Sequence, residues 1–160
     1  MTDMFRAMAT VRLSQSIGVR SERVWGVICD LDGAPQRLSR IVAIEHLSGP
    51  KFGVGTRWRE TRTMFGREAT EELEVAAVDP GRAYTVVAES HGTKYHSELR
   101  IESRAEEASV LTMTFSAEAQ SLGTKVMAAT IGRLFRRATK KALAQDLAEI
   151  AAAAESPPNA

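Results

Sequence analysis

The chain has 160 residues, of which 44% are hydrophobic and 26% are charged, and its formal net charge is +1. This length and composition are typical of one globular domain whose core needs no cross-links. The 21 basic and 20 acidic residues nearly balance, so the sequence has no excess of positive charge with which to bind nucleic acid. We therefore expect no nucleic-acid partner.

The sequence lacks the apolar runs that mark secretion or membrane insertion. Residues 1–10 do not contain the apolar core of a secretory signal, and no stretch approaches ~18 consecutive apolar residues. The only cysteine, Cys29, cannot form an internal disulfide, which favours a reducing compartment. These features predict a cytoplasmic protein without integral membrane association. One domain is expected over residues 10–155, with flexible termini at residues 1–9 and 156–160.

The first part of the chain predicts one strand and two short helices. Residues 11–19 alternate apolar with polar side chains, which indicates a half-buried strand. Ser21 is expected to cap a helix that begins beside it, and the turn-forming residues 30–35 end that helix. A second short helix is predicted near residues 36–39.

The rest of the chain predicts a run of strands followed by one long helix. The strands are expected at residues 41–47, 56–64, 67–78, 83–90, 93–102 and 110–117. Because turns rather than helices connect them, they must form an antiparallel meander. Apolar residues at three- and four-residue steps predict a helix over residues 121–155. The sequence thus predicts an α+β fold in which a curved seven-stranded sheet wraps around this helix.

Two short hairpin turns indicate which side chains face the helix. A two-residue turn at residues 91–92 pairs Ser90 with Thr93, and residues that pair across strands share a face. The inward face of these two strands is then apolar and consists of Tyr84, Val86, Ala88, Tyr95, Leu99 and Ile101. The opposite face is polar, since it carries Lys94, His96, Glu98 and Arg100.

The turn at residues 65–66 leaves two registers open. A two-residue turn directs Trp58, Glu60, Arg62, Glu71 and Leu73 inward, whereas a three-residue turn directs Arg57, Arg59 and Thr61 inward instead. We prefer the first register because it buries Trp58 against Leu73. It also places two carboxylates, Glu60 and Glu71, side by side with Arg62 near them. Either the arginine is shared between them, or one carboxyl has a raised pKa, or the group is a solvated ion pair at the rim.

Other chemistry-bearing residues point to structural roles. Cys29 has no basic cluster beside it and is interpreted as a buried structural thiol. The three histidines, His46, His91 and His96, lack the spacing of a metal site, so we expect no metal and no cofactor. Residues 51–55 contain two glycines without a following helix, and we interpret them as a connection that acts as a mobile lid.

The order and spacing of several segments resemble the START-like superfamily, also called SRPBCC or the polyketide cyclase/dehydrase and lipid transport family. The resemblance covers about residues 11–155. The residues that carry it are Ser21-Glu22-Arg23-Val24-Trp25, Asp30, Pro35, Gly53-x-Gly55-Thr56, Asp79-Pro80-Gly81-Arg82 and Lys141-Ala142-Leu143-x-x-Asp146-Leu147. This resemblance implies a helix-grip fold with a deep cavity between the sheet and the last helix.

Members of this superfamily bind lipids, sterols, polyketides or plant hormones, and others cyclise polyketides, assist chaperones or act in toxin–antitoxin pairs. The leading hypothesis is therefore binding or transport of a hydrophobic small molecule by a monomer or homodimer. The expected ligand-binding residues are Trp58, Glu60, Arg62, Glu71, Leu73, Tyr84, Val86, Tyr95, Ser97, Leu99, Met113, Phe115, Met127, Ile131, Leu134 and Phe135.

Two alternatives remain open. The first is a polyketide cyclase or dehydratase, with Glu71 or Glu60 as general base and Arg62 stabilising an enolate. The second is a protein-interaction module, which would need a large exposed apolar patch.

Overall fold

The computed structural model describes the backbone of residues 8–119 and 122–157 and the side chains of residues 10–118 and 136–157. The elements follow the expected order, with one strand, two short helices, six strands and a long helix. Their bounds are β1 (Met8–Ile17), α1 (Ser21–Cys29), α2 (Ala34–Arg37), β2 (Ile41–Ser48), β3 (Arg57–Met64), β4 (Arg67–Asp79), β5 (Ala83–Ser90), β6 (Thr93–Ala105), β7 (Ala108–Ala119) and α3 (Leu122–Glu155).

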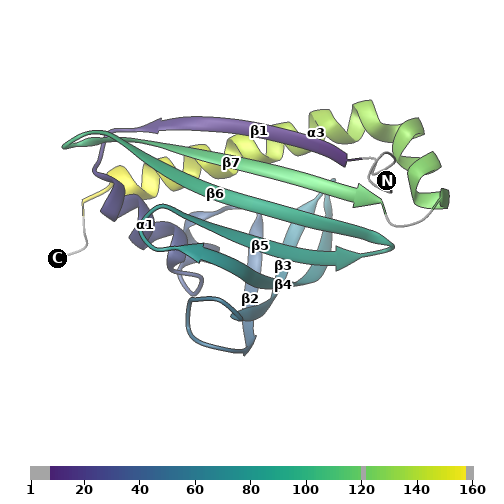
Figure 1. Cartoon of the computed structure of the whole chain (residues 1–160), viewed down its shortest axis with the longest axis horizontal. Helices are drawn as coiled ribbons and strands as arrows, with labels where there is room; N and C mark the ends of the chain where they lie inside the picture. Colours follow the sequence, from purple (N-terminus) through teal and green to yellow (C-terminus); the bar gives the residue numbers. More distant parts are fainter. Residues whose placement is uncertain (1–7, 120–121, 158–160) are drawn as a thin grey trace, which may run out of the picture.

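All seven strands form one antiparallel sheet in the order β1-β7-β6-β5-β4-β3-β2. The sheet curves, and α3 runs along β1 and β7 (Figure 1). The short helices α1 and α2 lie near the C-terminal half of α3. The chain passes from one edge strand, β1, to the other, β2, through α1 and α2. The predicted α+β helix-grip fold is confirmed.

Both predicted two-residue hairpin turns are present. Phe65 and Gly66 have φ values of 51° and 74°, and His91 and Gly92 have φ values of 51° and 73°. Positive φ at both central residues is the signature of the type I′ turn, whose twist matches that of the flanking strands. Met64 therefore pairs with Arg67 and Ser90 pairs with Thr93. The preferred register of β3 is confirmed, and Trp58 lies opposite Leu73.

The start of α1 and the position of α2 differ from the sequence-based expectations. Ser21 is the first residue of α1, the capping position belongs to Arg20, and no side chain caps this end. A serine caps a helix only from the position before the first turn, so the predicted role of Ser21 is wrong. The short helix α2 begins two residues earlier than expected, because Pro35 suits the first turn of a helix.

Aromatic contacts hold residues 51–55 against α1 and β5. The ring of Phe52 packs edge-on against Tyr84 at 5.0 Å and against Trp25 at 6.3 Å. The buried Thr56 hydroxyl donates a hydrogen bond of 2.9 Å to the carbonyl of Pro50. The Tyr84 hydroxyl donates to the carbonyl of Ile28 at 3.0 Å, near the end of α1. These contacts tie Phe52 and the end of the segment to α1 and β5, while Val54 between them is 62% exposed.

The apolar core lies between the inner face of the sheet, α1 and the C-terminal half of α3. Leu111 and Val75 contribute from the sheet, Val24 from α1, and Leu147 and Ala154 from α3. Each of these side chains is at most 1% exposed. Among the described residues, no helix combines the length and apolar character required to span a bilayer.

Two glycine substitutions test the turn geometry. Gly66→Ala should lower the free energy of unfolding by roughly 1–2 kcal/mol, because the positive φ of Gly66 is a left-handed conformation that is unfavourable for a residue with a Cβ atom. Gly26→Ala, in the exposed middle of α1, should raise it by up to about 1 kcal/mol, because alanine favours helix and its Cβ meets no atom within 4 Å. Urea denaturation measures both. Equal effects of the two substitutions would contradict the assigned turn.

Candidate functional site

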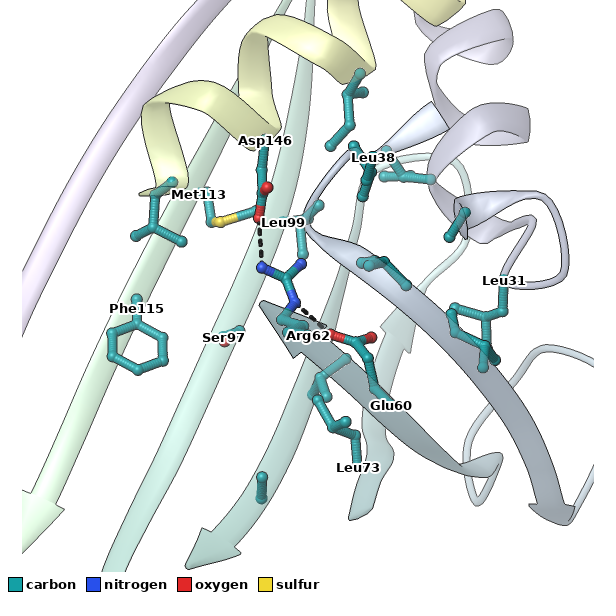
Figure 2. Close-up of a pocket in the computed structure, with 18 of the residues that line it drawn as sticks. Leu31, Leu38, Glu60, Arg62, Leu73, Ser97, Leu99, Met113, Phe115 and Asp146 are labelled. Atoms are coloured by element: carbon teal, nitrogen blue, oxygen red, sulfur yellow. Dashed lines mark hydrogen bonds and ion pairs between the residues drawn. The ribbon is translucent and has the colours of Figure 1, made fainter. Parts of the chain in front are cut away.

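A cavity of about 300 Å³ lies between the concave face of the sheet, the α1–α2 segment and the C-terminal half of α3. Its walls are mainly apolar, and the close-up view shows Leu31, Leu38, Leu73, Leu99 and Phe115 around it (Figure 2). Strand alternation places every second side chain of β3, β4, β5, β6 and β7 toward this space. The cavity therefore exists because α3 does not pack directly onto the centre of the sheet.

Arg62 is at the centre of the polar part of the cavity wall. Its Nε lies 2.5 Å from Oε1 of Glu60, and its Nη1 lies 2.8 Å from Oδ2 of Asp146 (Figure 2). Trp58 donates its indole N–H to the other oxygen of Glu60 at 3.2 Å. Glu60 and Arg62 are two residues apart on β3 and so share its inner face, while Asp146 reaches them from α3.

This group of charges is largely removed from solvent. The side chain of Asp146 is 2% exposed, that of Glu60 is 11% exposed and that of Arg62 is 27% exposed. Burial alone would lower the pKa of Arg62, but the charges of Glu60 and Asp146 outweigh it and raise its pKa above the usual value. Burial raises the pKa of Asp146, although the charge of Arg62 acts in the opposite direction.

One oxygen of Asp146 has no hydrogen-bond partner among the described residues. Its Oδ2 accepts the hydrogen bond from Arg62, whereas its buried Oδ1 accepts none from the residues that the structure describes. Burying a carboxylate oxygen without a hydrogen bond is costly. Asp146 lines the cavity, but this oxygen is itself removed from solvent, so it lies in the packed interior behind the ion pair.

The predicted binding residues come together where the structure describes them. The cavity lining includes Trp58, Glu60, Arg62, Glu71, Leu73, Tyr84, Val86, Tyr95, Ser97, Leu99, Met113 and Phe115. Tyr95 and Phe115 stack on each other, with ring centroids 5.7 Å apart. The remaining predicted residues, Met127, Ile131, Leu134 and Phe135, lie outside the described side chains.

The expected sharing of Arg62 between Glu60 and Glu71 is wrong. Glu60 and Glu71 do pair across β3 and β4, but the second carboxylate on Arg62 is that of Asp146. Glu71 lines the cavity without a hydrogen bond or ion pair to any described residue. The low exposure of Glu60 also rules out a solvated ion pair at the rim. Asp146 was missed because a strand register cannot show which helix residue meets the sheet.

Sequence reasoning also missed the wall that α1, α2 and β2 provide. Val27, Leu31, Leu38, Ile41 and Ile44 all line the cavity from this side. Asp30 and Arg37 line it too and form an ion pair of 2.7 Å with each other. The sequence does show that these residues are apolar and regularly spaced. That pattern is the same for a cavity wall and for a packed core, so it could not predict the wall.

A polar network beside the cavity holds α3 to the start of β2. Glu149 accepts hydrogen bonds from the backbone N–H and the hydroxyl of Ser39, at 2.8 and 2.6 Å. Gln145 accepts a 3.0 Å hydrogen bond from Arg40 and donates one of 2.9 Å to Ser39. Because Gln145 immediately precedes Asp146, these bonds fix the position from which Asp146 reaches Arg62.

The other candidate residues keep structural roles. Cys29 is only partly buried, and this burial raises its pKa to about 12, which favours the protonated thiol over the reactive thiolate at neutral pH. Among the described residues, no group of three or more histidine, cysteine, aspartate and glutamate side chains is arranged to hold a metal ion.

Comparison with known proteins identifies the family. The sequence profile described as polyketide cyclase / dehydrase and lipid transport matches residues 8–155. The chain therefore belongs to this family. A search among curated proteins found no match.

Solved structures share the fold at low sequence identity. An aromatase/cyclase, Zhui from Streptomyces sp. R1128, matches with a TM-score of 0.79 at 16% identity, covering 92% of this chain and 94% of that one. A START superfamily protein from Mycobacterium smegmatis matches with a TM-score of 0.76 at 11% identity, covering 91% and 97%. A truncated norcoclaurine synthase from Thalictrum flavum matches with a TM-score of 0.73 at 13% identity, covering 99% and 100%. At these identities the likeness shows the fold alone.

Removing the positive charge of Arg62 should destabilise the folded protein, because Glu60 and Asp146 lose their countercharge. Arg62→Met should lower the free energy of unfolding by about 3 kcal/mol, because Glu60 and Asp146 are left buried without a countercharge. Combining it with Glu60→Gln and Asp146→Asn should restore most of that loss. Arg59→Met, which breaks exposed pairs on the same strand, should change the free energy of unfolding far less than Arg62→Met does. Denaturant unfolding of the four proteins measures the differences, and a triple variant as unstable as Arg62→Met would contradict the electrostatic explanation.

Proposed function

We propose that this protein binds a hydrophobic small molecule, of lipid-, sterol- or polyketide-like character, in the cavity between the sheet and α3. The observation that carries the proposal is an apolar cavity of about 300 Å³ with a small, buried cluster of charged groups in its wall. Ligand pockets are typically apolar with a few fixed polar groups, and their volumes begin near 300 Å³. The volume favours a compact ligand over a long acyl chain.

The residues divide into two proposed roles. Apolar contact would come from Leu73, Val86, Leu99, Met113 and the stacked Tyr95 and Phe115. Orientation would come from Arg62, whose Nε and Nη1 are engaged by carboxylates while its Nη2 makes no hydrogen bond to a described residue. A carbonyl oxygen of the ligand is the natural acceptor for that remaining N–H group.

Occupancy of the cavity can be tested with two neighbouring residues of β5. Ala88→Phe should weaken binding of the neutral fluorescent probe N-phenyl-1-naphthylamine at least tenfold, because Ala88 lines the cavity and the added ring fills part of it. Val87→Phe should leave the affinity within about threefold, because Val87 pairs with His96 on the opposite face. Fluorescence titration measures both dissociation constants.

Two results would count against the binding proposal. The first is a wild-type protein that neither carries a ligand in native mass spectrometry nor takes up the probe. The second is equal weakening by Ala88→Phe and Val87→Phe, which would place the probe elsewhere on the protein. Thermal unfolding of both variants shows whether either substitution acts through stability instead.

A second candidate function is a polyketide cyclase or dehydratase, and the position of Glu71 favours it. Its carboxylate lines the cavity and, among the described residues, has no hydrogen bond or ion pair, so it is available as a base. Glu60 is less suitable, since Arg62 and Trp58 occupy its oxygens. Glu71 would remove a proton from a carbon beside a ketone, and Arg62 would stabilise the enolate oxygen.

Glu71→Gln distinguishes the two candidates. If the protein is an enzyme of this kind, the substitution should lower kcat on a poly-β-ketone substrate at least about a hundredfold and change ligand affinity little. Glu72→Gln, which alters the adjacent residue on the outer face, is the matched control. Unchanged turnover in Glu71→Gln would overturn the assignment of the base.

A further inference from the structure

Glu71 is a carboxylate of the cavity wall that has no countercharge within the described lining. It lies on the inner face of β4, directly opposite Glu60 on β3. Both guanidinium groups of that lining are already engaged, since Arg37 pairs with Asp30 at 2.7 Å and Arg62 has two other carboxylate partners. Two carboxylates opposite each other repel, and a cavity screens this repulsion poorly. A positive charge beside Glu71 is therefore favourable.

The oxygens of Glu71 are accessible to a bound molecule. They make no hydrogen bond to any described residue, and in this part of the chain Oδ1 of Asp146 is the only buried side-chain oxygen or nitrogen that lacks one. The oxygens of Glu71 are consequently not buried, and its side chain is partly exposed. Glu60 differs, because Trp58 and Arg62 donate hydrogen bonds to its two oxygens. Glu71 is thus a free carboxylate that a molecule in the cavity can reach.

An aromatic ring lies close to this carboxylate. Tyr95 on β6 and Leu73 on β4 both pair with Ala88 on β5, so these three side chains form one row on the inner face, and Glu71 follows Leu73 on the same face. Burial, and then the nearby charge of Glu71, raise the pKa of Tyr95. Tyr95 also stacks on Phe115 at 5.7 Å. Aromatic rings attract a cation, so the ring and the carboxylate favour the same kind of ligand group.

We propose that Glu71 is a specificity-determining residue of the cavity, and that it selects ligands in which an apolar body carries a protonated amine. The inference rests on the proposed binding function and narrows it to one ligand chemistry. The ammonium group pairs with the carboxylate of Glu71 beside the ring of Tyr95, and the apolar body occupies the rest of the cavity. Apolar carboxylates are disfavoured, because Arg62 already has two carboxylate partners.

A matched ligand series tests the inference on the wild-type protein. Three compounds carry the same 2-naphthylmethyl body and differ in the charge of the head group: 2-naphthylmethylamine, 2-naphthalenemethanol and 2-naphthaleneacetic acid. Each is titrated at neutral pH against bound N-phenyl-1-naphthylamine, and displacement of this probe reports binding in the cavity. We expect the amine to bind at least about tenfold more tightly than the alcohol, and the carboxylate to bind most weakly.

Glu71→Gln tests the residue itself, because it removes the charge and keeps the size of the side chain. The affinity ratio of amine to alcohol should fall to within about threefold, while the affinity for the uncharged alcohol should change by less than about threefold. Glu72→Gln is the matched control. It removes the same charge from the adjacent residue, which pairs with Arg59 on the outer face, and should leave the ratio unchanged.

The outcomes separate this inference from the binding proposal. An amine that binds wild-type protein no more tightly than the alcohol, or a carboxylate that binds most tightly, would overturn the amine inference and leave the cavity as a binding site. Equal loss of the ratio in Glu71→Gln and Glu72→Gln would show that net charge decides, and would overturn the role of Glu71. Failure of N-phenyl-1-naphthylamine and of all three compounds to bind would overturn the binding proposal as well. Circular dichroism shows whether each variant folds, and the wild-type series decides the ligand class without them.

Discussion

The attachment of Arg62 to two buried carboxylates is the constraint on which the cavity depends. Arg62 extends from β3 and Asp146 descends from α3, so their hydrogen bond links the sheet to the helix across the interior. An arginine side chain is long and its guanidinium must keep its partners at hydrogen-bond distance. The helix consequently cannot pack onto the sheet at this point, and a space remains beside the bond.

Stability alone does not account for this arrangement. A buried ion pair of this kind rarely stabilises a protein more than apolar packing of equal volume would. What it provides here is a guanidinium held in a fixed position in a mainly apolar wall, with its Nη2 making no hydrogen bond to a described residue. Buried polar groups that lack partners discriminate strongly between ligands, because the wrong ligand leaves them unpaired.

The fold and the family are compatible with both ligand binding and catalysis, and they do not decide between the two. The similar structures include an aromatase/cyclase, a START superfamily protein and a norcoclaurine synthase, all at 16% identity or less. Catalysis and simple binding would use the same cavity and much of the same wall, and they differ in what Glu71 does. Function on this scaffold is therefore a property of a few inward side chains.

The sequence by itself determined the order of the strands and most of their registers. Glycine at the second position of each two-residue turn and the alternation around Tyr84 predict the register of β5 and β6, and the burial of Trp58 favours the observed one of two registers for β3, because a one-residue slip would reverse every side chain. Twelve of the expected binding residues could therefore be placed along the cavity. Only the tertiary structure decided that Asp146 meets Arg62 and that α1 and α2 close one wall. Helix periodicity defines which face of α3 is inward, but the rotation and depth at which it docks depend on contacts between residues distant in the chain.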